Sequence, residues 1–328
     1  MPIYHQLGVV PRKRNATFLK ADGGDHFVEQ VGSAGYGGAS TRLYHLHDPA
    51  RVISTRQAFE LVWKKEQPRP LRYRHFRTHR LPAPDRIPLL FNDDVALHTW
   101  TPHKSGFYRN AQADEVLFVT EGAGTVETQM GELAYQPGDF VVIPRGIIHR
   151  LRMDPVRHRF FIIESRGAVR IPRGHRNGMG QLRDDAPYGE RDIRRPRALP
   201  VQDERGEFSL VVKKDNWLQE VILGHHPFDV AGWDGYFYPW ALQAGDCAPG
   251  KLLSGDGFAV GQGGLGEEVV YCVKTTAAGV ESGSLVLHPQ GLTPKTIPCE
   301  VAVRLTVAKP LEIGEGSHSV EDVEYSRS

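Results

Sequence analysis

Short hydrophobic runs alternate with turn residues along the chain, and no long stretch shows helical periodicity. Val, Ile, Phe and Tyr fill these runs, and 35 glycines and 23 prolines punctuate them, which favours a β-rich protein. Six strands are predicted in the middle of the chain, at residues 95–100, 115–120, 124–128, 140–143, 148–153 and 159–164. Six strands within about 70 residues are typical of a β-sandwich or a small barrel.

A second series of strands follows an irregular, arginine-rich segment at residues 165–200, which we interpret as a crossover connection. We expect these strands at residues 208–213, 217–223, 235–242, 257–260, 268–274, 284–288 and 299–307. The first 90 residues predict a short helix near 55–63 and strands near 27–31 and 40–46. Those two strands could complete either barrel.

One spacing in the first series carries more information than the rest. Gly138, Pro144, Gly146 and His149 follow the pattern G-x5-P-x-G-x2-H, which Glu115-x6-Gly122 precedes. In physical terms, a strand enters a barrel, a Pro-Gly turn reverses it, and the histidine on the returning strand points inward toward the earlier glutamate. These spacings match the two signature motifs of the cupin superfamily, so this region resembles a cupin barrel.

The second series repeats the spacing at Gly283, Pro289 and Gly291, with Pro294 at the histidine position and Glu268 as the counterpart of Glu115. We therefore predict an all-β bicupin with two jelly-roll (cupin) β-barrels. Residues 1–90 form an N-terminal arm that contributes strands to the barrels, and 91–165 form the first barrel. Residues 166–206 form the Arg-rich crossover, and 207–328 form a second, shortened barrel.

Imidazoles and one carboxylate with open positions form the usual non-haem iron site. The stretch just before Glu115, where cupins carry a histidine pair, contains no histidine. An ion in the first barrel would therefore need His149, Glu115 and either His98 or His103. The alternative is an ion-free barrel in which His149 hydrogen-bonds to Glu115.

Composition narrows the class of protein. The length of 328 residues fits about two domains. Forty Lys and Arg against 39 Asp and Glu give a net charge of +1, without the basic excess of a nucleic-acid-binding protein. No signal-peptide pattern or 18-residue apolar run is present, so no membrane partner is expected. Three widely spaced cysteines argue against a disulfide framework or a thiolate metal site, so we expect a reducing, cytoplasmic location.

Several stretches resemble the homogentisate 1,2-dioxygenase family, particularly its shorter bacterial members. Residues 4–14 and 44–47 are similar to the family's N-terminal arm, residues 108–149 and 227–239 to its first barrel and crossover, and residues 309–314 to its C-terminus. The resemblance implies an iron(II) dioxygenase that opens a hydroquinone-type ring. It also implies a trimer or hexamer, with the iron in the second barrel.

The family's iron ligands are a histidine shortly before a glutamate and a histidine after the Pro-Gly turn. Here the glutamate matches Glu268, but the first histidine falls among Gly261 and Gln262 and the last falls at Pro294. The family's acid–base histidine also has no counterpart in the short segment 242–257. The chain is thus identified as a diverged member that lacks the iron-binding histidines, and ordinary homogentisate cleavage is not expected.

Three functional hypotheses follow. The first is an enzyme, such as a metal-independent isomerase or lyase, that acts on an aromatic or quinonoid small molecule by acid–base chemistry in the second barrel. Its predicted catalytic residues are Glu268, His288 and Gln262, and its predicted substrate-binding residues are Tyr271, Tyr236, Tyr238 and Trp233. The structural alternatives are that Glu268 and His288 only hydrogen-bond to each other in a packed interior, and that the aromatic residues pack between the barrels.

The second hypothesis is an iron(II)-dependent, ring-cleaving dioxygenase with its ion in the first barrel, held by His149, Glu115 and either His98 or His103. The third is a non-catalytic cupin that binds a small aromatic ligand or supports a homologue. Each is expected to be a homo-oligomer by family resemblance.

Overall fold

The computed structural model describes residues 3–13, 18–35, 37–67, 70–248, 250, 252–255, 258–260, 266–275, 281–293, 295, 297 and 299–323. Strands dominate these ranges, and the helical elements named in them are 3-10 turns of three to six residues. The predicted all-β fold is confirmed. None of the helices in these ranges is long and apolar enough to cross a membrane.

Two facing sheets form a central barrel. The seven-stranded sheet has the order β19 (Trp240–Gln243), β13 (Asp139–Ile143), β10 (Asp114–Glu121), β15 (Arg159–Ser165), β8 (Val95–Trp100), β7 (Ile87–Phe91) and β25 (Glu312–Ile313). The eight-stranded sheet has the order β12 (Gly131–Tyr135), β11 (Gly124–Thr128), β14 (His149–Met153), β9 (Phe107–Asn110), β16 (Arg205–Lys214), β17 (Trp217–His225) and β4 (Val52–Thr55), with β5 (Phe59–Glu60) also on β17. Hydrogen bonds between side chains of β9 and β10, and of β15 and β16, cross the interior.

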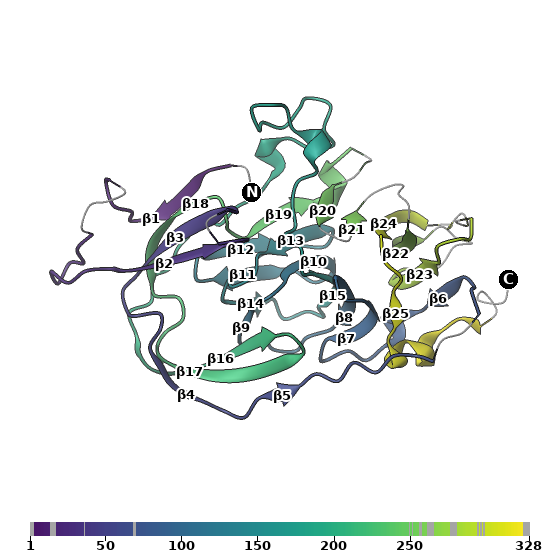
Figure 1. Ribbon diagram of the computed structural model, residues 1–328, viewed down its shortest axis with the longest axis horizontal. Coiled ribbons are helices and arrows are strands. Elements are labelled where there is room, and N and C mark those ends of the chain that lie inside the picture. The colour runs from purple at the N-terminus through teal and green to yellow at the C-terminus, as the bar shows by residue number, and fades with distance from the viewer. Residues whose placement is uncertain are drawn as a thin grey trace.

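A four-stranded sheet lies at one end of the molecule, at the left of Figure 1. Its order is β1 (His5–Gly8), β18 (Val230–Gly235), β3 (Ser40–His45) and β2 (Phe27–Gly32). The strands predicted near 27–31 and 40–46 are therefore present. They pair with each other and with β18 instead of completing a barrel.

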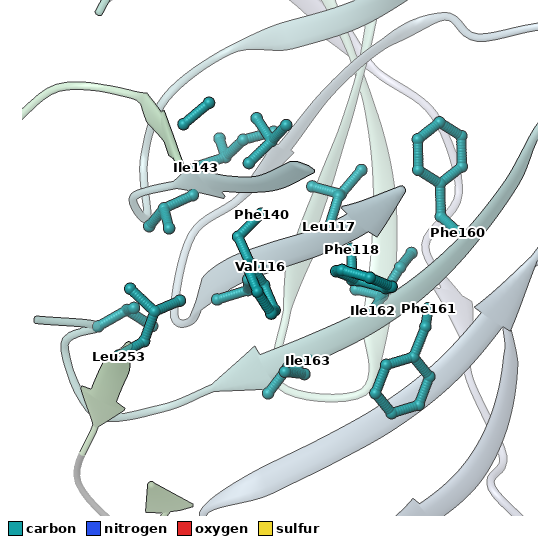
Figure 2. Close-up of a cluster of buried hydrophobic side chains, with 14 of the residues drawn as sticks. Val116, Leu117, Phe118, Phe140, Ile143, Phe160, Phe161, Ile162, Ile163 and Leu253 are labelled. Carbon is teal, nitrogen blue, oxygen red and sulfur yellow. The ribbon is translucent and has the colours of Figure 1, made fainter. Parts of the chain in front are cut away.

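A six-stranded sheet lies at the opposite end (Figure 1). Its order is β20 (Leu253–Gly255), β21 (Phe258–Val260), β24 (Cys299–Val307), β22 (Glu267–Thr275), β23 (Ser284–His288) and β6 (Arg74–Phe76). One face packs on the outer face of the seven-stranded sheet, where Tyr271 stacks on Phe161 with ring centroids 4.3 Å apart. Figure 2 shows Phe118, Phe161, Ile163 and Leu253 in this cluster. The apolar area removed from water there holds the two units together.

The sheets place one domain boundary differently from the sequence prediction. Strands β16 and β17 belong to the central barrel, β18 to the N-terminal sheet and β19 to the seven-stranded sheet. The six-stranded sheet takes its own strands only from β20 onward, together with β6 from the N-terminal arm. A second barrel that starts at residue 207 therefore does not fit the observed pairing. Among the residues described, this unit is one sheet.

The helix predicted near residues 55–63 is wrong. The chain there runs extended along β17, where the backbone N–H of Arg56 donates to the carbonyl of Glu220 at 2.9 Å. Strand β5 follows, with Phe59 opposite Leu218. Pairing with the open edge of β17 supplies the backbone hydrogen bonds that a helix would have made internally. The predicted strand 235–242 likewise divides into β18 and β19.

The expectation that the cysteines are unpaired is also wrong for two of them. Cys272 on β22 and Cys299 on β24 form a disulfide, with Cα atoms 5.8 Å apart. The two strands are antiparallel neighbours, so the fold brings together residues 27 positions apart in the sequence. Cys247 is the free cysteine. The cysteine count therefore gives no support for a reducing compartment, and a cytoplasmic location stays a prediction.

A buried histidine joins β3 of the N-terminal sheet to its neighbours. His45 is 3% exposed, its Nδ1 lies 2.7 Å from Oδ1 of Asp229, and its Nε2 lies 3.2 Å from Oε2 of Glu29. Asp229 also accepts from the backbone N–H of His47, and His225 lies 3.6 Å from it. Burial alone would lower the pKa of His45, but the two carboxylates outweigh it and raise the pKa to about 9.

This raised pKa predicts a pH-dependent stability. The folded protein binds the proton of His45 more tightly than the unfolded chain, whose value is 6.5. The stabilisation is complete below pH 6.5 and is lost as the pH rises through about 9, with an upper bound of about 3 kcal/mol. In urea unfolding between about pH 6 and about pH 10, His45→Gln should flatten the decline in stability. His26→Gln, whose ring stacks on Phe18, should keep the wild-type slope; equal slopes in wild type and His45→Gln would contradict the assignment.

Candidate functional site

Polar side chains line the interior of the central barrel. Glu115 on β10 lies directly opposite Glu164 on β15, so both carboxylates lie on the same face of the seven-stranded sheet. Both are buried, at 1% and 6% exposure. A buried carboxylate is costly unless it is paired and hydrogen-bonded, so the partners of each define what this interior can do.

Glu115 is surrounded by donors. Its Oε1 accepts hydrogen bonds from Nη1 of Arg86 at 2.6 Å, from the hydroxyl of Tyr108 at 3.0 Å and from Nδ2 of Asn110 at 3.0 Å. The guanidinium of Arg86 also lies 4.6 Å from the ring centroid of Tyr108. Burial would raise the pKa of Glu115, but Arg86 outweighs it and lowers the pKa to about 2. Glu115 is therefore ionised and neutralised by Arg86.

His149 on β14 lies opposite Tyr108 of β9, and the two rings meet edge to face with centroids 5.4 Å apart. Its Nδ1 donates to the carbonyl of Ile147 at 3.2 Å, and not to Glu115 as the ion-free alternative expected. Burial lowers the pKa of His149, against the opposing charge of Glu115. The imidazole is therefore neutral at pH 7.

Glu164 has a separate set of partners. Nζ of Lys213 on β16 donates to both carboxylate oxygens, at 2.5 Å for Oε2, and Nε2 of His98 lies 3.5 Å from Oε2. The Lys213 ammonium also lies 4.9 Å from the ring centroid of Trp63. Burial would raise the pKa of Glu164, but His98 and Lys213 outweigh it and hold the pKa far below its usual range.

These contacts do not fit an iron site in the central barrel. His98 faces Glu164, and His103 is exposed on the loop between β8 and β9, where it lines a surface cavity with Asp154 and His158. Within the ranges that the structure covers, no three His, Cys, Asp or Glu side chains gather in a way suited to a metal ion. The guanidinium of Arg86 beside Glu115 would also repel a cation. The described residues do not supply the predicted ligand set.

The second unit brings two predicted catalytic residues together. Glu268 on β22 and His288 on β23 are directly opposite in the register, on the sheet face that points away from the central barrel. Nδ1 of His288 lies 3.0 Å from Oε2 of Glu268, and Nη1 of Arg304 on β24 lies 3.5 Å from Oε1. This hydrogen bond is expected both for a predicted acid–base pair and for the alternative in which the two residues only satisfy each other.

The free nitrogen of His288 is buried. His288 is 1% exposed, and its Nε2 has no hydrogen-bond partner within the described part of the chain. The ring of Tyr73 lies edge to face with His288, with centroids 5.7 Å apart. Burial lowers the pKa of His288, although Glu268 opposes this effect. The pair therefore consists of a neutral imidazole oriented by a carboxylate.

The predicted substrate-binding aromatic residues do not lie beside this pair. Tyr271 is 1% exposed, on the opposite face of β22, against Phe161. Trp233 and Tyr238 are fully buried near the N-terminal sheet, and Tyr236 is 44% exposed beside Tyr4. Trp233 and Tyr271 are thus core residues, but Trp233 packs on β18 of the N-terminal sheet and not between the barrels. Gln262, the third predicted catalytic residue, lies outside the described residues.

Sequence reasoning missed Arg86, Glu164 and Lys213, which hold most of the charge inside the barrel. The one available signal was a charged residue at an inward position of a strand. For Glu164, that signal is a carboxylate after the apolar run of β15, opposite the motif residue Glu115.

Comparison with known proteins identifies the family to which the chain is similar. Residues 89–243 match the family described as homogentisate 1,2-dioxygenase N-terminal. A predicted dioxygenase from Saccharolobus solfataricus is 36% identical over 268 residues, which cover 77% of this chain and 67% of that protein.

Two solved structures illustrate more distant similarity. A cupin 2 conserved barrel domain protein from Leptotrichia buccalis is 10% identical, with 80% of this chain and 98% of that chain covered and a TM-score of 0.32. An oxalate decarboxylase variant from Bacillus subtilis is also 10% identical, with coverage of 80% and 78% and a TM-score of 0.29.

Proposed function

Because the chain belongs to the homogentisate 1,2-dioxygenase-like family of cupins, we propose that it is a diverged enzyme acting on an aromatic or quinonoid small molecule. Its chemistry is acid–base catalysis by Glu268 and His288 in the second unit. The observation that carries this proposal is the hydrogen bond between the two residues, which leaves Nε2 of His288 buried without a partner in the described ranges.

The geometry suits proton transfer. Glu268 accepts a hydrogen bond from the Nδ1–H group of His288. This bond fixes the tautomer and leaves a lone pair on Nε2. Burial lowers the pKa of His288, so this nitrogen is unprotonated at pH 7. A substrate that displaces the side chains covering it, Tyr73 among them, would give it a proton from a carbon or hydroxyl. The Glu268 charge then stabilises the imidazolium until the proton returns to another substrate atom. The net reaction is an isomerisation, and no oxidant is consumed.

The alternative, an iron(II)-dependent ring-cleaving dioxygenase with its ion in the first barrel, has less support. Arg86 already neutralises the charge of Glu115 through Oε1, and His98 is directed to Glu164. The non-catalytic alternative remains distinct, because it predicts ligand binding without turnover.

Turnover in the presence of a chelator tests the proposal. Chelator-treated protein in D₂O is incubated with hydroxylated aromatic acids, quinones and their ring-opened ketones, and proton NMR follows conversion and deuterium uptake. We expect turnover to survive chelation and to fall about 10²- to 10⁴-fold in His288→Ala. Glu268→Gln should lower the rate and shift its pH profile, because the imidazolium loses its counter-charge. His26→Ala, in the N-terminal arm, should retain the wild-type rate.

Three outcomes would overturn the assignment. Full activity in His288→Ala removes the residue from the mechanism. Loss of activity on chelation, with recovery on adding Fe(II), supports the dioxygenase alternative. Ligand binding without conversion of any compound supports a non-catalytic protein. Circular dichroism of each variant separates these outcomes from misfolding.

A further inference from the structure

The chain between β23 and β24, which we call the strap, passes from one edge of β22 to the other. β23 and β24 pair antiparallel with opposite edges of β22, so they run parallel to each other. Parallel neighbours need a connection that returns along the length of the sheet. The strap therefore leaves His288, beside Glu268, and returns to Cys299 at the other end of β22. The structure describes its residues 289–293, 295 and 297.

Ile297 shows over which face of the sheet the strap runs. Its side chain is 3% exposed and packs with Val270, Cys272 and Val286. Alternate residues of a strand point to the same face, so Val270 and Cys272 lie on the face that carries Glu268. The strap therefore runs over the same face as the acid–base pair and not over the face that packs on the central barrel.

Tyr73 connects the strap to His288. The two rings lie edge to face, with centroids 5.7 Å apart, and the Tyr73 hydroxyl donates to the carbonyl of Thr293 in the strap at 2.6 Å. Nζ of Lys295, also in the strap, lies 4.3 Å from the centroid of the Tyr73 ring. With these groups in place, His288 is 1% exposed and its Nε2 is buried. A substrate reaches this nitrogen only when Tyr73 and the strap move.

A disulfide fastens the far end of the strap. Cys299 is bonded to Cys272 of β22, with Cα atoms 5.8 Å apart. The ladder between β22 and β24 already sets their register, so the bond mainly fixes the residue at which the strap ends, two positions after Ile297. We propose that the strap is a lid over the Glu268–His288 pair, held closed by this disulfide and released when a dithiol reduces it. This inference rests on the function proposed above, because it describes how that site is regulated.

The release is a thiol–disulfide exchange. Cys299 is half-buried and Cys272 is fully buried, so a thiolate of the dithiol attacks Sγ of Cys299 and expels Sγ of Cys272. The second thiol of the reductant then attacks this mixed disulfide, which frees Cys299 and closes a cyclic disulfide in the reductant. The dithiol thus supplies the two electrons and the two protons that convert the cystine into two thiols. Afterwards only packing and hydrogen bonds hold the strap on the sheet.

Chemical labelling of His288 tests the lid without any substrate. Diethyl pyrocarbonate acylates accessible imidazoles, and peptide mass spectrometry measures each histidine of the full chain separately. We expect labelling of His288 to rise at least about tenfold once dithiothreitol has reduced the protein and been removed, because the strap then opens more often. Cys299→Ser should show the same rise without dithiothreitol. Cys247→Ser, which changes the free cysteine, should behave as wild type in both states.

Two labelling results contradict the lid. One is equal labelling of His288 in oxidised and reduced protein. The other is an equal rise at His149, which is buried in the central barrel, because the disulfide would then hold the whole chain together and not the strap alone. Reduced wild type provides the same readout if Cys299→Ser does not fold.

Turnover separates this inference from the function on which it rests. Faster turnover in reduced wild type and in Cys299→Ser than in oxidised wild type supports both. Turnover that is unchanged by reduction overturns the lid and leaves the acid–base assignment intact. Reduction-dependent labelling of His288 without turnover in either state overturns the acid–base assignment and leaves the lid.

Discussion

Replacing Lys213 with methionine is expected to lower the free energy of unfolding by about 3–5 kcal/mol. Lys213 and Glu164 are 4% and 6% exposed, and the Lys213 ammonium is bound to both oxygens of Glu164. Without it, the carboxylate retains only His98, at 3.5 Å, inside the barrel. An unpaired buried charge costs more than the pair contributes, which is why the effect is large. Urea unfolding at pH 7 measures it.

The neighbouring lysine provides a matched control. Lys214 follows on β16 and is exposed, so Lys214→Met should change the unfolding free energy by less than about 0.5 kcal/mol. Combining Lys213→Met with Glu164→Gln should recover part of the loss, because no ionised group is then left unpaired. The cost of Lys213→Met should also shrink as the pH falls below 4.5, where the variant gains by protonating Glu164. Equal costs for the two lysine variants would contradict this account.

Arg74→Met is expected to have an effect of similar size at the other end of the molecule, about 3–5 kcal/mol. Nη2 of Arg74 donates to Glu66 at 2.8 Å and to Glu321 at 2.7 Å, and all three side chains are at most 5% exposed. The substitution removes the cation that the two buried carboxylates share, although Arg72 still lies 3.2 Å from Glu321 and His318 lies 3.1 Å from Glu66. It should also release the C-terminal segment from β6, which limited proteolysis would detect as earlier cleavage near Glu321.

An exposed ion pair serves as the comparison. Arg80 pairs with Glu281 at 2.9 Å, with both side chains about half exposed, so Arg80→Met should cost at most about 1 kcal/mol. If Arg74→Met costs no more than this, the buried carboxylates find other partners and the proposed network does not anchor the C-terminus.

Local patterns were sufficient to predict many of the strands. The bounds of β8, β11, β23 and β24 agree with the sequence prediction, because each apolar run ends at a clear turn or polar residue. The repeated Gly-Pro-Gly spacing also indicated Glu268 as the counterpart of Glu115. In the structure Glu268 and His288 are register partners on the adjacent strands β22 and β23.

Pairings between distant segments could not be predicted in the same way. Glu164 and Lys213 are 49 residues apart, and their contact depends on β16 joining the barrel beside β9, in parallel. The disulfide between Cys272 and Cys299 depends on β22 and β24 being neighbours. Residues near 55–63 are extended rather than helical, because they pair with the open edge of β17. In each case the deciding contact is with a strand whose position a single sequence does not reveal.

The pairing of β6 with β23 sets an order of events during synthesis. Phe76 pairs with Leu285, so β6 leaves the ribosome about 210 residues before its partner. At about 5–20 residues per second, β6 waits for roughly 10–40 s, during which the barrel strands between them can already assemble. The six-stranded sheet is therefore completed only after β24 has been made, by a strand synthesised about 210 residues before its partner β23. A C-terminal fragment starting near residue 250 would expose the edge of β23 and tend to aggregate.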